Sequence, residues 1–179
     1  DSMAVATGSI KVATQAAETG VISLYIAGVR VQLTVLATDT PAQIATALVA
    51  AITRKTELPV TAAVKADATD TVTLTAKNAG LLGNGIDIRL NYLGVQGGEV
   101  TPAGLILTIT GMTGGAGAPD FVDALGNLQD KTFDFVINPY DDTASLDAIR
   151  EFLNDATGRW AWDKQLYGHA FTTTNGTYA

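Results

Sequence analysis

Two neighbouring runs near the start of the chain place an apolar residue at every second position. In residues 22–26 every even-numbered residue is isoleucine or leucine, and in residues 29–35 every odd-numbered residue is valine or leucine. Side chains of a strand alternate between its two faces, so each run predicts a strand with one buried face. Only Ala27 and Gly28 separate the runs, and so short a connection predicts a β-hairpin.

A helix is predicted after the hairpin, because characteristic residues mark its start. Thr40 suits the N-cap, Pro41 suits the first helical position, and Gln43 can complete a capping box with Thr40. The apolar residues that share one face at helical spacing are Ile44, Ala47, Leu48, Ala51 and Ile52. This helix therefore has a face that can pack on a sheet.

Four further apolar runs predict strands before a glycine-rich segment. They cover residues 60–64, 72–76, 86–90 and 105–110. Residues 1–18 are small and polar, which predicts a linker or a weak first strand. We therefore expect residues 19–110 to form a β-rich α+β module with one amphipathic helix on a sheet.

The sequence pattern changes after this module. Residues 111–118 are rich in glycine, which predicts a flexible hinge between two domains. The elements predicted beyond it are a helix over 119–129, a strand over 133–137, a helix after Asp141 and Asp142, and a strand over 166–172. Their order predicts a βαβ unit with parallel strands, so residues 119–179 are interpreted as an incomplete α/β domain. The predicted fold class is α+β, with a β-rich module followed by part of an α/β domain.

Charge and composition exclude several functions. The net charge of −7 and the lack of any lysine and arginine cluster argue against a nucleic-acid partner. The chain has no cysteine, so thiolate chemistry and thiolate metal sites are excluded. No apolar run approaches the roughly 20 residues of a membrane-spanning helix, so no membrane partner is expected.

The glycine-rich segment is a candidate nucleotide-binding loop, since it follows a predicted strand and precedes a predicted helix. However, Gly111–Gly117 lacks the Gly-Lys-Ser/Thr ending of a P-loop, and its spacing does not match the dinucleotide fingerprint. Pro119 also removes a backbone N–H that a phosphate would use. A hinge is therefore the favoured interpretation, and nucleotide binding remains an alternative.

Three other groups of residues could carry chemistry. Asp141 and Asp142 could bind a metal, but no further ligands lie at suitable spacing, and helix capping explains them. His169 is the only histidine, and no G-x-S-x-G motif supplies a serine partner, so a structural role is predicted. Trp160 and Trp162 are predicted to pack over the end of the preceding helix.

The sequence Asn175-Gly176-Thr177 fits a glycosylation acceptor, and we interpret it as a chance match. No catalytic, cofactor-binding or metal-binding residue is therefore predicted, and no cofactor is expected.

Three stretches of the chain, taken in order, resemble the tail sheath proteins of Mu-type contractile phages. The first is LYIAGVRV at residues 24–31, with the helix start at Asp39-Thr40 and IATA at 44–47. The second consists of LPVTA at 58–62, VTLTAKN at 72–78 and IDIRLNY at 86–92. The third runs from Gly114 through Asn138-Pro139-Tyr140 and Gly158-Arg159-Trp160 to Gly168-His169-Ala170-Phe171. The third stretch is the most specific, because the first two form a module that recurs in other phage structural proteins.

The resemblance implies a structural virion protein without catalytic residues. Sheath subunits polymerise around the tail tube and drive contraction, so neighbouring subunits and the tube protein are the implied partners. The implied location is the virion tail, assembled in the cytoplasm of the host bacterium. The resemblance also implies that this chain is the middle part of a subunit. Terminal arms that exchange strands between neighbours would then be absent, and the fragment alone is expected to be monomeric.

Two alternatives remain open at this point. One is another phage tail or baseplate protein that shares the β-rich module, and an all-β structure for residues 112–179 would favour it. The other is a nucleotide-binding enzyme that uses Gly111–Gly117.

Overall fold

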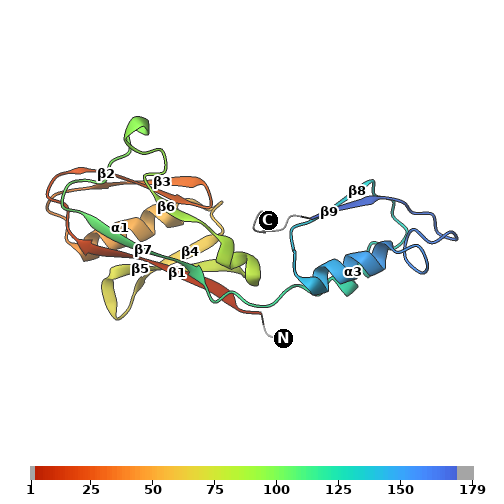
Figure 1. The fold of residues 1–179 in the computed structure, drawn as a ribbon. Coiled ribbons are helices and arrows are strands. Elements are labelled where there is room, and N and C mark those ends of the chain that lie inside the picture. Colours follow the sequence, from red (N-terminus) through yellow and green to blue (C-terminus); the bar gives the residue numbers. More distant parts are fainter. Residues whose placement is uncertain (1–2, 173–179) are drawn as a thin grey trace, which may run out of the picture. The chain divides into compact units, whose positions relative to one another are not determined.

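The computed structural model describes residues 3–172 and divides the chain into two compact units, 1–117 and 118–179. Figure 1 shows the elements of both units, which are described separately below. None of the described helices is both long enough and apolar enough to cross a membrane.

The first unit contains a four-stranded antiparallel sheet in the order β4-β5-β1-β7. Its strands are β1 (Val5–Thr14), β4 (Val60–Lys65), β5 (Ala68–Ala79) and β7 (Ile106–Thr113). The strands predicted over 60–64, 72–76 and 105–110 are thus present, and β5 and β7 are longer than predicted.

β1 corrects the prediction of a linker or weak strand for residues 1–18. It is a central strand that pairs with β5 on one side and β7 on the other. Its inward residues Ala6, Ile10 and Val12 are completely buried. The inward position between Ala6 and Ile10 is Gly8, where a Cβ would lie 2.8 Å from Met112 Sδ. Small inward residues weaken the apolar alternation, which is why the sequence predicted at most a weak strand here.

The second sheet of this unit is antiparallel and has the order β3-β2-β6. It consists of β2 (Gly20–Ile26), β3 (Val29–Val35) and the short β6 (Ile88–Leu90). The predicted hairpin is confirmed. Ala27 and Gly28 both have positive φ angles, 50° and 78°, as a two-residue hairpin turn of type I′ requires.

The helix α1 (Pro41–Thr53) forms as predicted, with Thr40 at the N-cap and a complete capping box to Gln43. Its buried residues are Ile44, Ala45, Leu48, Ala51 and Ile52. They join inward residues of both sheets, such as Ile10, Leu24 and Leu74, in one hydrophobic core. The module is therefore an α+β unit, as predicted, and its core includes β1.

Two short 3-10 helices, η1 (Leu81–Gly85) and η2 (Val95–Gly97), connect β5 to β6 and β6 to β7. β7 continues through Gly111 to Thr113, so the first part of the predicted 111–118 hinge is ordered strand. The division between the two units falls after Gly117.

The second unit contains α2 (Phe121–Gly126), β8 (Phe135–Asn138), α3 (Thr143–Leu153) and β9 (His169–Thr172). β8 and β9 are parallel, so the predicted strand–helix–strand unit is confirmed. Both strands and α2 are shorter than predicted. α3 ends at Leu153, and Asn154 is its C-cap.

One face of β8 is exposed to solvent in this chain. Phe135 is 66% exposed and Ile137 is 82% exposed. The parallel register places Phe171 of β9 beside Ile137, and Phe171 is also exposed. We call Phe135, Ile137 and Phe171 the apolar sheet face of the second unit.

Candidate functional site

The glycine-rich segment is tied to the rest of the first unit. The backbone N–H of Gly115 donates to Asn84 Oδ1 at 2.8 Å, and Asn84 Nδ2 donates to Gly115 O at 2.9 Å. Ala116 and Ala4 exchange two backbone hydrogen bonds of 2.9 and 3.2 Å. The N–H groups of Gly115 and Ala116 that a phosphate could use are therefore already occupied.

Close packing explains the glycine at position 115. A Cβ there would lie 2.5 Å from the carbonyl oxygen of Gly80, too close for any side chain. Residues 114–117 thus form a junction with Ala4, Gly80 and Asn84, and the division between the two units falls within the segment predicted as a hinge. The nucleotide-binding alternative gains no support from this geometry.

Asp142 is a helix cap, as predicted. Its Oδ1 accepts from Ser145 N at 3.0 Å and its Oδ2 from Ser145 Oγ at 2.7 Å. The hydrogen bond from the Ser145 backbone, followed by that from its hydroxyl, lowers the pKa of Asp142 below its ordinary value. Within residues 3–172, no three His, Cys, Asp or Glu side chains gather into a metal site.

The other candidates lie apart from one another. His169 is exposed in β9, with its ring 6.3 Å from the ring of Phe135. Trp162 is 84% exposed, so the prediction that it packs over the helix end is wrong, and Trp160 is only partly covered. The buried residues of the segment 159–162 are Arg159 and Ala161, not the two tryptophans. Asn175-Gly176-Thr177 lies outside the described residues.

Arg159 forms a buried polar centre that was not singled out from the sequence. Its guanidinium donates to the backbone carbonyl of Gln129 at 2.5 Å and to that of Lys131. It also lies over two rings, 5.0 Å from the centroid of Phe152 and 5.8 Å from that of Phe133. Arg159 therefore fixes the loop between α2 and β8 to the segment that follows α3.

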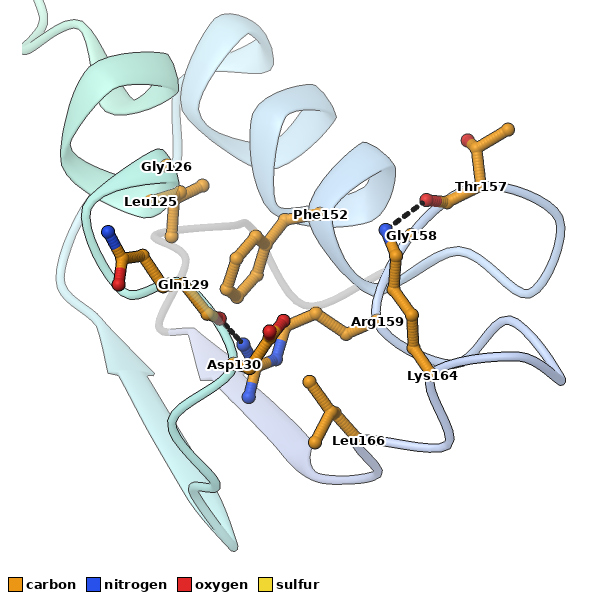
Figure 2. A pocket seen from close by; sticks show the side chains of 10 residues that line it. All are labelled: Leu125, Gly126, Gln129, Asp130, Phe152, Thr157, Gly158, Arg159, Lys164 and Leu166. Carbon is orange, nitrogen blue, oxygen red and sulfur yellow. Dashed lines mark hydrogen bonds between the residues drawn. The ribbon is translucent and has the colours of Figure 1, made fainter.

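A cavity of about 250 Å³ opens beside Arg159 (Figure 2). Its lining residues are Leu125, Gly126, Gln129, Asp130, Phe152, Thr157, Gly158, Arg159, Lys164 and Leu166. Lys164 Nζ donates to the carbonyl of Thr157 at 2.9 Å, so this lysine is held against the cavity wall.

A second buried centre lies in the first unit, around Glu99. Its Oε1 accepts from the Tyr25 hydroxyl at 2.6 Å, and its Oε2 accepts from Leu93 N at 2.9 Å. Arg30 Nη1 lies 3.5 Å from Oε1. Glu99 therefore holds the loop between β6 and β7 on the β2–β3 hairpin.

Burial alone would raise the pKa of Glu99. The hydrogen bonds from Tyr25, Leu93 and Arg30 outweigh burial, and the pKa of Glu99 falls below its ordinary value. The hydrogen bond between Tyr25 and Glu99, followed by burial, raises the pKa of Tyr25, because the protonated phenol is the form that donates to the carboxylate.

The sequence offered no local signal for either centre. Tyr25 and Glu99 are 74 positions apart, and Arg159 lies 30 positions from Gln129. The arginine donates hydrogen bonds to backbone carbonyls. Every residue has a backbone carbonyl, so the residue types of the partners give no signal in the sequence. Only the folded chain brings these groups together.

The buried polar groups described above hold loops and chain segments in place. The fold combines an α+β module, residues 1–117, with a unit that contains a parallel strand–helix–strand arrangement, residues 118–179.

Comparison with known proteins identifies one similar protein. No family model matches the chain. The chain is 39% identical over 178 residues to the protein named Mu-like prophage FluMu tail sheath protein of Haemophilus influenzae. The match covers 99% of this chain and 35% of that relative, so the chain spans about a third of the relative's length. The resemblance to Mu-type tail sheath proteins inferred from the sequence is thereby confirmed.

Proposed function

We propose that this chain is part of a contractile tail sheath subunit, a structural protein of a phage-like virion. The observation that carries this proposal is the 39% identity, which extends over nearly the whole chain to a relative named as a tail sheath protein. In this function the full-length subunit polymerises around a tail tube, and its work is mechanical rather than catalytic. The proposed partners are neighbouring sheath subunits and the tube protein, in the virion tail.

The second unit favours a sheath over a tube, baseplate or adhesion protein that shares only the β-rich module. Such an alternative predicted an all-β structure for residues 112–179. Instead, β8, α3 and β9 form a parallel strand–helix–strand unit. This unit corresponds to the part of the sequence in which the resemblance to sheath proteins was most specific.

The second unit is proposed to be an incomplete α/β domain in this chain. Parallel sheets are normally covered on both faces, whereas the apolar sheet face formed by Phe135, Ile137 and Phe171 is exposed. Further segments of the full-length subunit are proposed to cover this face. Because those segments are not part of this chain, the chain alone is expected to be monomeric.

Negative-stain electron microscopy of the full-length parent protein, beside this chain, tests the proposal. Tubes or stacked rings from the parent and dispersed particles from the 179-residue chain are the expected results. A parent that stays dispersed under all assembly conditions would contradict the sheath function. Rings formed by the chain alone would contradict the proposal that assembly needs other segments.

The nucleotide-binding enzyme remains a distinguishable alternative. It would require micromolar binding of a nucleotide that is lost when Gly117 is replaced by a bulkier residue in a variant that still folds. No such binding is expected, because Gly115 and Ala116 already donate their backbone N–H groups within the unit.

A further inference from the structure

Arg159 carries a buried positive charge whose close partners are uncharged. The residue is 6% exposed, and its guanidinium contacts two backbone carbonyls and the rings of Phe133 and Phe152. Within the described residues, no carboxylate oxygen lies within 4.0 Å of it. Buried arginines are usually paired with an anion, because a desolvated charge without one is costly.

The cavity beside Arg159 has a positive lining in an acidic protein. Two of its lining side chains, Arg159 and Lys164, are cationic and one, Asp130, is anionic. The whole chain, in contrast, carries a net charge of −7. Figure 2 shows the guanidinium among Gln129, Phe152 and Leu166, with Lys164 on the side of Thr157 and Gly158. An anion in this cavity would therefore meet a local field opposite to that of the protein as a whole.

The guanidinium also has unused donors. It offers five N–H groups, and two hydrogen bonds, to Gln129 O and Lys131 O, are formed within the described residues. A planar carboxylate can accept two parallel N–H bonds from one guanidinium, and its single charge suits a cavity that also contains Asp130. A doubly charged phosphate would be repelled more strongly by the Asp130 carboxylate.

We propose that this cavity binds a carboxylate group, which accepts hydrogen bonds from Arg159 and is attracted by Lys164. The carboxylate is either that of a small acid or an acidic side chain presented by a protein segment. The proposal does not depend on the sheath function, because it concerns binding to the isolated chain.

Nuclear magnetic resonance of the 179-residue chain tests the proposal. Sodium acetate is titrated against sodium chloride at the same ionic strength, and the Arg159 Nε–H signal is followed. A saturable shift of this signal is expected, whereas exposed Arg150, which pairs with Asp147, should show only a linear drift. A linear drift at Arg159 as well would overturn the proposal.

Lys164→Gln supplies the matched variant, because Arg159 itself holds the loop and its replacement endangers the fold. Acetate affinity should fall about two- to fivefold in Lys164→Gln, the range of a partly exposed charge, and stay unchanged in Lys65→Gln. Lys65 pairs with Asp67 on the first unit and lies outside the cavity. Equal affinities in wild type and Lys164→Gln would count against the proposal, as would tighter binding of phosphate than of acetate.

A third titration distinguishes the two sources of the carboxylate. N-acetyl-aspartate amide presents the side-chain carboxylate in a peptide-like setting. Tighter binding of this compound than of acetate would identify a protein segment as the ligand. Binding of acetate alone would identify a small acid.

Discussion

At the residue scale, Glu99 is a charged side chain that is buried in the first unit. It accepts hydrogen bonds from Tyr25 and Leu93 and lies near Arg30, and these partners together hold a long loop on the hairpin. The buried carboxylate is stabilised in its charged form, so its contribution to stability depends on pH.

The direction of that dependence follows from the lowered pKa of Glu99. A carboxyl whose pKa is lower in the folded state stabilises the fold above its unfolded pKa of about 4.3. This stability is lost as the pH falls through the folded pKa. We therefore expect Glu99→Gln to flatten the fall in melting temperature between pH 6 and pH 3, as measured by circular dichroism.

The matched control is Asp67→Asn, which removes an exposed carboxylate that pairs with Lys65. This variant should keep nearly the acid dependence of the wild type, because exposed pairs contribute little. If Glu99→Gln and the wild type lose stability in parallel, the buried carboxylate does not control the acid response.

At the scale of the element, β1 joins β5 and β7 in one sheet. Ile10 on this strand is completely buried in the core, whereas Lys11 points outward and is exposed. We expect Ile10→Ala to lower the free energy of unfolding by about 2–5 kcal/mol, because it leaves a cavity.

Lys11→Ala should change that free energy by about 0.5 kcal/mol or less, since it removes only a surface ion pair of 3.8 Å. Urea unfolding followed by circular dichroism measures both variants. A small effect of Ile10→Ala would mean that the strand is dispensable.

In the segment after β7, position 115 has room only for glycine. A Cβ on Gly115 would meet Gly80 O at 2.5 Å, whereas a Cβ on Gly111 would meet nothing within 4 Å. Gly115→Ala should therefore destabilise the first unit by about 1–3 kcal/mol, the usual range for overpacking. Gly111→Ala should be neutral or slightly stabilising, because alanine restricts the unfolded chain more than glycine does.

Thermal unfolding of the two glycine variants side by side makes the comparison. Equal melting temperatures of the two variants would show that residues 114–117 can move to accept a side chain at position 115 without loss of stability.

At the scale of the whole molecule, the chain consists of two units that differ in how far their apolar side chains are covered. The first has a closed core made from two sheets and a helix, whereas the second leaves Phe135, Ile137 and Phe171 exposed. The same substitution should therefore act differently in this chain and in the full-length parent.

Ile137→Thr is the variant that tests this difference. In the 179-residue chain it should change the unfolding free energy by about 0.5 kcal/mol or less, because Ile137 is 82% exposed. In the full-length parent it should reduce stability or the yield of tubes, as seen by thermal unfolding and electron microscopy. Thr61→Ser, on the outer side of β4, is a control that should leave both proteins unchanged. An Ile137→Thr parent that assembles normally would mean that the face stays open there.

The sequence predicted the elements whose signals are local. The hairpin around Gly28 followed from apolar alternation, α1 from the cap at Thr40, and α3 from the cap at Asp142. For β1 the sequence left a linker and a weak strand open, because the inward face of this strand includes Ala6 and Gly8, which carry little apolar signal.

The buried polar centres could not be predicted for a different reason. Glu99 and Arg159 meet partners that are distant in sequence, and several of those partners are backbone groups. Burial of a charged side chain is a property of the folded chain, so residue type and spacing carry no trace of it. The same holds for the exposure of β8, since an apolar run looks alike whether or not another segment covers it.

The paired backbone of Ala4 and Ala116 has an architectural consequence. These residues exchange hydrogen bonds, so the polypeptide enters and leaves the first unit at one point. A unit with adjoining entry and exit can sit within a surface loop of a host domain without separating the two sides of that loop. A short turn that replaced residues 4–116 would therefore have to span only the distance between two paired strands.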